Sequence, residues 1–342
     1  MTHTISRRGA LGGALGLGTL VLGRPHVARA AVKPPINIGY FVETKPTNIV
    51  KAQGLLEKAT GQTVTWTEYG SGAEINAAIV AGGADIGFGS GSSPVAAAIS
   101  QGLPVWLVGL VDNIGPAEEL TVRSSAHIHS VADLKGRKVA TPFGSTSHFR
   151  LLGLLKQNGL TQKDVTVIDL RGDAIVAAWS RGDIDGAYIW APAKSKLLAD
   201  GGSVFKTWDK LDAVGYVIAD TIVARAGFAE QQPLAVTALL KVYGQALDFY
   251  RTQPDEAAKV VAKAAGVSPD VAAADLKEYD FISLADQLKP DWLGSQGKPG
   301  KFAEVLHHTA EFLVEQKSIK SAGPLATYQK AIHTEFLRQA LA

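Results

Sequence analysis

The chain has 342 residues, of which 46% are hydrophobic and 19% are charged, and it contains no cysteine. This composition excludes a disordered chain, a disulfide framework and any site built on a thiolate. The formal net charge is +2, but residues 1–30 hold four arginines and no acid, so the rest of the chain has 30 basic and 32 acidic residues, a net charge of −2. A slightly acidic body argues against a nucleic-acid partner, because phosphates attract basic surfaces.

The first 30 residues have the pattern of an export signal. Arg7 and Arg8 precede a glycine-rich apolar run over residues 9–23, and a small-residue cleavage site follows at Ala28-Arg29-Ala30. This order is that of a secretory signal peptide, and the apolar run is too short to span a membrane. Paired arginines before a weakly apolar run are typical of the twin-arginine route to the bacterial periplasm. A buried N-terminal helix is the alternative, which the glycines disfavour.

From residue 36 onward, strand patterns alternate with helical patterns. This alternation predicts α/β layers with a largely parallel sheet. The expected strands are Ile36–Tyr40, Thr63–Trp66, Asp85–Gly89, Val105–Val111, Lys138–Thr141, Val165–Leu170 and Gly186–Trp190.

After about residue 225 the pattern becomes almost wholly helical. Apolar residues recur at helical spacing over residues 236–250 and again over residues 302–313. Gly266 is expected to end one helix, and Ser268-Pro269 to begin the next.

One stretch of sequence recurs at an offset of 100 residues. INAAIVAGGADIGF at 75–88 and IVAAWSRGDIDGAY at 175–188 share five identical residues, among them a glycine and the aspartate that follows it. Each unit is expected to form a helix, a glycine stop and a strand. Chance similarity in a chain rich in Ala and Gly is the alternative to two lobes of like architecture, which would leave a cleft suited to a small ligand.

The sequence lacks the motifs of several enzyme classes. It contains no phosphate-binding loop, no G-x-S-x-G elbow and no H-E-x-x-H motif. His307 and His308 are adjacent and do not share a helix face, so they make a poor metal site. We therefore expect no catalytic nucleophile with its base, no metal and no cofactor.

Three expected helices begin with hydroxyl residues. Ser71 opens an S-x-x-E capping box, Ser93 precedes Pro94 as an N-cap, and residues 145–147 precede an apolar helix over residues 148–155. Each alone is ordinary capping, but all three follow strands, whose ends face the ligand crevice in α/β sheets. Free N–H groups and hydroxyls at helix starts bind anions without a cation, which suits a sulfonate.

The stretches that contain these helix starts, together with residues 174–193, resemble the taurine-binding members of the nitrate/sulfonate/taurine family of periplasmic solute-binding proteins. The resemblance rests on GSGAEINAAIVAGGADIGFGSGSSP (70–94), TPFGSTSHFRLLGLLK (141–156) and AIVAAWSRGDIDGAYIWAPA (174–193), the third being the most specific. It implies a receptor that captures taurine and delivers it to the inner-membrane permease of an ABC importer. We expect a monomer.

The resemblance also implies a fold. It is the α/β, two-lobed periplasmic binding protein fold (type II-like), in which each lobe is a mixed sheet flanked by helices and the helical C-terminal part packs on lobe one. The expected division is an export signal at 1–30, lobe one at 31–120 and 222–342, and lobe two at 121–221. The expected crossovers lie near residues 120–123 and 218–223.

Taurine carries a sulfonate and an ammonium group, so the cleft should offer an anion cradle and a carboxylate. Asp220 matches the family's acidic residue before the second crossover, and Glu118 matches one beside the first. A surface carboxylate is the alternative for each, and a core tryptophan is the alternative for Trp190. The full set of candidate ligand-binding residues is Tyr40, Glu43, Ser71, Ser92, Ser93, Glu118, Ser145, Thr146, Trp190 and Asp220.

Two other functions remain open at this point. The same fold could bind another alkanesulfonate or a small anion, and it could carry an enzyme. A simple anion would not need Asp220, whereas an enzyme would need a reactive group with a partner.

The export pattern generates the first prediction. Replacing both arginines, Arg7→Lys with Arg8→Lys, should leave unprocessed precursor in the cytoplasm, because the twin-arginine route requires the pair. Immunoblotting of cell fractions measures this, and normal periplasmic maturation of the double variant would contradict it.

Overall fold

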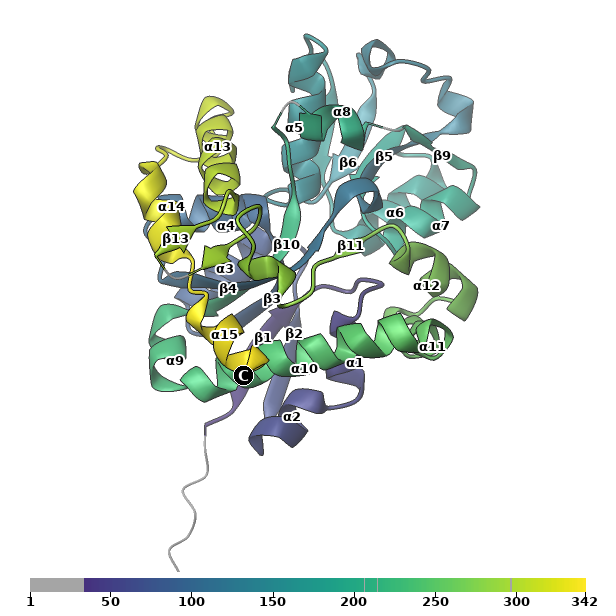
Figure 1. Ribbon diagram of the computed structural model, residues 1–342. Helices are drawn as coiled ribbons and strands as arrows, with labels where there is room; N and C mark the ends of the chain where they lie inside the picture. The colour runs from purple at the N-terminus through teal and green to yellow at the C-terminus, as the bar shows by residue number, and fades with distance from the viewer. Residues whose placement is uncertain (1–33, 206, 214, 296) are drawn as a thin grey trace, which may run out of the picture. The chain divides into compact units, whose positions relative to one another are not determined.

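A computed structural model describes residues 34–342 except residues 206, 214 and 296 (Figure 1). The expected export signal and residues 31–33 lie outside the described residues. Within the described part of the chain, no helix combines the length and the apolar character needed to cross a membrane.

The first sheet has six strands in the order β11-β4-β10-β3-β1-β2. The pairs that β1 makes with β2 and β3 are parallel, whereas β10 is antiparallel to both β3 and β4. Its strands are β1 (Ile36–Tyr40), β2 (Val64–Glu68), β3 (Ile86–Gly91), β4 (Val105–Asn113), β10 (Ala219–Arg225) and β11 (Asp280–Phe281).

The second sheet has five strands in the order β7-β6-β8-β5-β9, all drawn from residues 119–205. The chain leaves the first sheet at the end of β4, enters the second at β5 and returns at β10. Its strands are β5 (Glu119–Arg123), β6 (Lys138–Thr141), β7 (Thr166–Asp169), β8 (Gly186–Ile189) and β9 (Gly202–Phe205).

The largely parallel sheet expected from the alternation is wrong, because both sheets are mixed, as the resemblance implied. In the first, β10 runs back from the second sheet and inserts between β3 and β4 in the opposite direction. In the second, β5 is antiparallel to both of its neighbours, β8 and β9. The two connecting strands thus supply most of the antiparallel pairing, while all seven expected strands are present, with their ends shifted by up to two residues.

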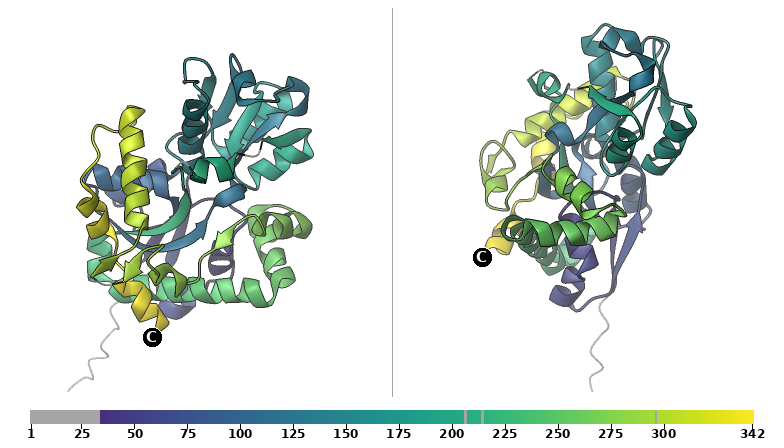
Figure 2. Two further views of the ribbon diagram at one scale, coloured as in Figure 1. Left: turned by 45° about the horizontal axis from the view of Figure 1, so that its top comes forward. Right: turned by 90° about the vertical axis from the view of Figure 1, so that its right-hand side faces the viewer.

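The helices of residues 146–213 accompany the second sheet, and the remaining helices accompany the first (Figures 1 and 2). The former are α5 (Thr146–Gln157), α6 (Gly172–Arg181), α7 (Ala193–Ala199) and α8 (Trp208–Ala213). The latter, before β10, are α1 (Thr47–Ala52), α2 (Leu55–Thr60), α3 (Gly72–Val80) and α4 (Ser92–Ser100).

The predicted helical C-terminal part is confirmed. The long helix α10 buries the apolar face expected over residues 236–247, and Gly266 ends α11 in a left-handed conformation. These helices are α9 (Ala226–Gln231), α10 (Pro233–Thr252), α11 (Pro254–Ala265), α12 (Pro269–Leu276), α13 (Phe302–Glu315), α14 (Leu325–Ala331) and α15 (Glu335–Leu341), with a hairpin of β12 (Gly294–Ser295) and β13 (Lys298–Pro299) before α13.

The sequence repeat corresponds to a structural repeat. In both units a helix ends, a glycine takes a positive φ (74° at Gly82 and 78° at Gly182), and a strand begins after the aspartate. The Asp85 N–H donates to the carbonyl of Asn37 at 2.7 Å, and the Asp185 N–H donates to that of Lys138 at 2.9 Å. Each sheet therefore contains one strand that is entered through the same helix–turn–strand connection.

The side chains of the two aspartates also play matching roles. The Asp85 carboxylate accepts the backbone N–H of Asn37 at 3.0 Å, and the Asp185 carboxylate accepts that of Lys138 at 2.8 Å. Asp85 is the more buried of the two and also receives the Asn37 amide at 3.1 Å and the Arg225 guanidinium at 2.5 Å.

This difference predicts unequal costs. Asp85→Ala should lower the free energy of unfolding by about 3 kcal/mol, because three hydrogen bonds to a buried carboxylate are lost. The matched control Asp185→Ala loses one backbone hydrogen bond and a solvent-screened ion pair with Arg137 at 3.6 Å, both in a more exposed position, and should cost about 1 kcal/mol. Urea denaturation measures both, and equal losses would contradict the assignment.

Candidate ligand-binding site

A small cavity lies where the strand ends of the first sheet meet the start of α5. The space left in it for the centre of a water molecule is about 10 Å³. It is lined by Phe41, Glu43, Gly72, Gly91, Pro94, Glu118, Ser145, Thr146, Trp190 and Asp220.

The starts of three helices contribute to this lining. Gly72 is the first residue of α3, Gly91 is the N-cap of α4, and Ser145 is the N-cap of α5. The first turn of a helix leaves backbone N–H groups without partners inside the helix, and the helix dipole favours negative charge there. This side of the cavity is therefore suited to an anion.

Two of the helix starts differ from the sequence expectation. The helix α4 begins two residues before Pro94, so Ser93 lies inside its first turn and is not the N-cap. The Ser92 hydroxyl instead accepts the backbone N–H of Ala219 at 3.3 Å, which ties α4 to β10. The helix α5 begins at Thr146 rather than 148, and the Ser145 side chain caps it by accepting the His148 N–H at 3.1 Å.

The helices α4 and α5 approach each other closely at the cavity. A Cβ added at Gly91 would lie 2.6 Å from Cγ2 of Thr146, and one added at Gly72 would lie 2.2 Å from Pro94. Glycine is needed at both positions because backbone and side chain come together there.

A cluster of charged side chains lies on the side of the cavity formed by the sheet and the loop after β1. Asp220 on β10 and Asp112 on β4 are directly opposite each other in the sheet register. The Lys45 ammonium contacts Asp220, lies 3.0 Å from Asp112 and 3.4 Å from Glu43, and stands 4.3 Å above the ring of Tyr279. We call Glu43, Lys45, Asp112 and Asp220 the charge cluster.

Burial dominates the protonation of this cluster. It raises the pKa of Asp112 to about 7 and raises the pKa values of Glu43 and Asp220, while Lys45 acts in the opposite direction. The three carboxylates together raise the pKa of Lys45 above its usual range, against the effect of burial. Lys45 is thus held as a cation.

Glu118 lies beside the cluster, at the junction between the two sheets. Its carboxylate accepts the Thr146 hydroxyl at 2.7 Å. Burial, followed by the nearby Asp220, raises the pKa of Glu118 to about 7. The hydroxyl at the start of α5 and the carboxylate therefore share one corner of the cavity.

An aromatic pair closes another side. The rings of Phe41 and Trp190 lie 6.0 Å apart, and both line the cavity. Trp190 follows β8 directly, whereas Phe41 follows β1, so the pair joins the loops of the two sheets.

The structure brings six of the ten candidate residues into this one cavity: Glu43, Glu118, Ser145, Thr146, Trp190 and Asp220. The other four lie outside its lining. Ser71 caps α3 by accepting the Glu74 N–H, Ser93 lines a neighbouring apolar pocket, and Ser92 bonds to Ala219. Tyr40 contacts Lys51 and packs edge-on against Trp66.

Sequence reasoning missed two members of the charge cluster. Lys45 follows Glu43 by two residues in a loop, and Asp112 is the last but one residue of β4, which is apolar up to that point. A charged residue near the end of an apolar strand is the one sequence feature that could have identified Asp112 as a site residue. Nothing local shows that Lys45 reaches it.

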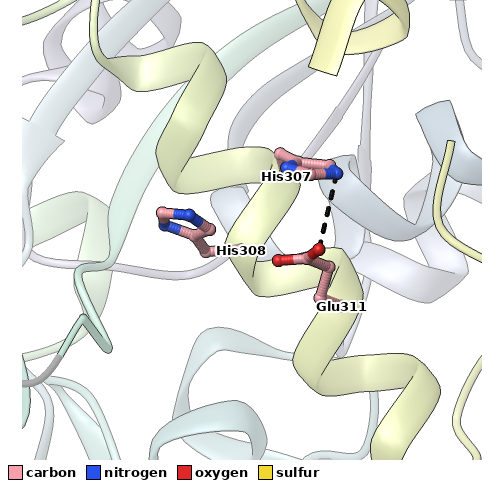
Figure 3. Close-up of side chains that lie close together, drawn as sticks. All are labelled: His307, His308 and Glu311. Atoms are coloured by element: carbon pink, nitrogen blue, oxygen red, sulfur yellow. Dashed lines mark ion pairs between the residues drawn. The ribbon is translucent and has the colours of Figure 1, made fainter. Parts of the chain in front are cut away.

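The histidine pair forms a separate feature on α13 (Figure 3). Nε2 of His307 lies 3.7 Å from the Glu311 carboxylate, and His307, His308 and Glu311 each offer a ligand atom within 4.8 Å of the others. The sequence argument considered only the two adjacent histidines and overlooked Glu311, which lies one helical turn further on, close to both. His308 and Glu311 are exposed, and the absence of a metal site stays a prediction.

Comparison with known proteins identifies the family of the chain. Residues 52–257 match the family model described as NMT1/THI5 like. The taurine-binding periplasmic protein of Escherichia coli K12 is 33% identical over 88% of this chain and 92% of its own length. The chain belongs to the NMT1/THI5-like family.

Solved structures of other proteins agree with the two-sheet architecture. The periplasmic aliphatic sulphonate binding protein SsuA of Escherichia coli has a TM-score of 0.69 at 26% identity, over 86% of this chain and 92% of that one. The alkanesulfonate-binding protein SsuA of Xanthomonas axonopodis, bound to MOPS, has a TM-score of 0.74 at 24% identity, over 89% and 100%. The chain has the two-lobed α/β fold of periplasmic binding proteins, as the resemblance implied.

The raised pKa values generate a stability prediction. Carboxyls that titrate near 4 in the unfolded chain titrate near 7 at Asp112 and Glu118. Between these values the folded protein binds more protons, so the free energy of unfolding should fall as pH rises from about 4 to about 7. Glu118→Gln should reduce this fall, and raise stability at pH 8 by on the order of 3 kcal/mol.

Chemical denaturation from pH 4.5 to pH 8 measures the effect. The exposed Glu230 provides the control, since Glu230→Gln should leave the profile unchanged. Parallel profiles for the wild type and Glu118→Gln would show that folding does not raise the pKa of Glu118.

Proposed function

We propose that this protein is a periplasmic receptor that captures taurine at the cavity described above and delivers it to an ABC importer. The space in this cavity is enough for about one water molecule, so the cavity must widen to admit taurine. The observation that carries the proposal is the meeting of three helix starts with a carboxylate cluster in one small space. One side favours an anion and the other a cation, which are the two ends of a small zwitterion.

The anion end is made from dipoles and not from full charges. The cavity lining holds no arginine or lysine, and its polar groups at this end are helix starts and the hydroxyls of Ser145 and Thr146. A sulfonate is fully ionised and weakly basic, so N–H and hydroxyl donors suffice to hold it. The sulfonate ligands named for the relatives support this assignment.

The cation end has an excess of negative charge. Asp220 and Glu118 both line the cavity and are nearly fully buried. Asp220 shares Lys45 with Glu43 and Asp112, and Glu118 has no ion-pair partner among the described residues. The remaining buried negative charge is costly, and an ammonium group placed between Asp220 and Glu118 would compensate it. An anion without an amine gains nothing from them.

Capture requires the two lobes to separate and close. We propose lobes at 31–120 with 222–342 and at 121–221, with the crossovers at β5 and β10. Contacts such as Arg171 with Glu74 at 3.3 Å and Lys156 with Glu315 at 2.6 Å join the two sets of residues. Both pairs are substantially exposed, so solvent screens them and they oppose opening only weakly.

The proposed function includes no catalytic step. Among the residues that line the cavity there is no histidine, and the hydroxyl that has an adjacent carboxylate, that of Thr146, belongs to a helix start.

Export by the twin-arginine route is part of the same proposal. Another alkanesulfonate in place of taurine is the second candidate, favoured by the SsuA structures.

Isothermal titration of the mature protein tests the ligand class. We expect taurine to bind more tightly than longer alkanesulfonates, and sulfate and nitrate to bind weakly or not at all. Tighter binding of an amine-free sulfonate would favour the second candidate.

Asp220→Asn gives the sharpest single-residue prediction. It keeps the shape of the side chain and removes its charge, so taurine affinity should fall by about 2–4 kcal/mol, or roughly 30- to 1,000-fold. Amine-free ethanesulfonate should lose far less. Titration of both ligands on both proteins forms a double-mutant-style cycle. Equal losses would show that Asp220 does not contact the ammonium group.

A further inference from the structure

Lys45 is the most deeply enclosed cation near the ligand site. It is 1% exposed and lies between Glu43, Asp112 and Asp220, with the Tyr279 ring at 4.3 Å. It does not line the cavity, so the carboxylates separate it from the ligand space.

Asp112 explains why Lys45 stays in place. Asp112 is completely buried, and within the described residues Lys45 is its one ion-pair partner. Moving the ammonium away to make room for a ligand would leave this carboxylate unpaired in the interior, which is strongly unfavourable. A ligand's ammonium group is therefore added beside Lys45 and does not replace it.

The charges near the site support addition. Three carboxylates of the charge cluster and the nearby Glu118 face one lysine, which leaves up to three uncompensated negative charges. The other titratable groups facing Lys45 and Asp112 are the hydroxyls of Tyr279 and Tyr243, which stay neutral because burial raises their pKa values.

We propose that Lys45 is a built-in counter-cation that permanently occupies one of two ammonium positions in the site. The second position, against Asp220 and Glu118, is left for the ligand, so the site takes ligands with a single ammonium group. This second statement rests on the proposed function. The first does not, and it implies that removing the lysine amine creates a new site for a small primary ammonium ion.

Lys45→Ala tests the counter-cation directly, without any sulfonate present. The substitution removes three carbons and the ammonium, the size of n-propylammonium. We expect the variant to melt about 5–10 °C below the wild type, because a buried ion pair is broken. n-Propylammonium chloride should restore at least half of this loss in a saturable way, whereas tetramethylammonium chloride at equal ionic strength should not.

Lys194→Ala is the matched control. Lys194 is also 1% exposed and pairs with a single carboxylate, Glu278, at 2.5 Å. The Glu278 side chain is 36% exposed, so water solvates its charge when the lysine is removed, and propylammonium should give this variant little selective gain over tetramethylammonium. Equal rescue of both variants, or no rescue of Lys45→Ala, would overturn the proposal.

A charge-balanced variant covers the case in which Lys45→Ala does not fold. Lys45→Met keeps the volume of the side chain without its charge, and this variant should be destabilised. Adding Asp112→Asn removes the carboxylate that has lost its ion-pair partner. The double variant should melt at least several degrees above Lys45→Met at pH 8. If the second substitution gives no recovery, Lys45 does not compensate Asp112.

Taurine titrations then separate the two proposals. Lys45→Ala should bind taurine at least tenfold more tightly when propylammonium is present. Propylammonium rescue in a protein whose wild type does not bind taurine would refute the proposed function and leave the counter-cation standing. Wild-type affinity for taurine in Lys45→Ala without amine would refute the counter-cation alone.

Discussion

The free energy of removing carboxylates from water is the constraint on which this site depends. Glu43, Asp112, Glu118 and Asp220 are each no more than 5% exposed, and one lysine offsets them. Each carboxylate is costly when ionised and unpaired. Burial accordingly moves the pKa values of Asp112 and Glu118 to about 7, so part of the charge is neutralised by protons. The site is therefore ready to exchange a proton for a cation.

The sheet topology creates this concentration of charge. Because β10 returns antiparallel between β3 and β4, Asp220 stands opposite both Gly91 and Asp112 in the sheet register. The same strand order brings the start of α4 beside the carboxylates, since α4 follows β3 directly. A parallel strand in this place would put its acidic end at the opposite edge of the sheet. The mixed sheet thus joins the anion-favouring and cation-favouring halves of the cavity.

Much of the fold follows from local patterns, but the charge cluster does not. Strand alternation predicted β1 and β6 to the residue, and the repeat predicted two equivalent joints, because these features depend on residues close in sequence. Asp220 and Glu118 were found through the resemblance. Lys45 and Asp112 were not, because their pairing joins a loop to a distant strand. The strand pattern did not show the antiparallel returns at β5 and β10 for the same reason, since strand direction depends on the path between the sheets, whereas the resemblance implied mixed sheets and crossovers at both places.

The two ends of the cavity respond differently to pH. A sulfonate and helix dipoles keep their charges across the physiological range, so the anion end is insensitive to protons. The carboxylates titrate near neutrality, so an arriving ammonium group competes with protons for them. Taurine bound in this way would release protons on capture and would be released more easily in an acidic medium. Lys45 limits the effect, because its fixed charge opposes the rise that burial causes in the pKa of Asp112. Affinity and its pH dependence are thus set by the balance between one fixed cation and one exchangeable cation.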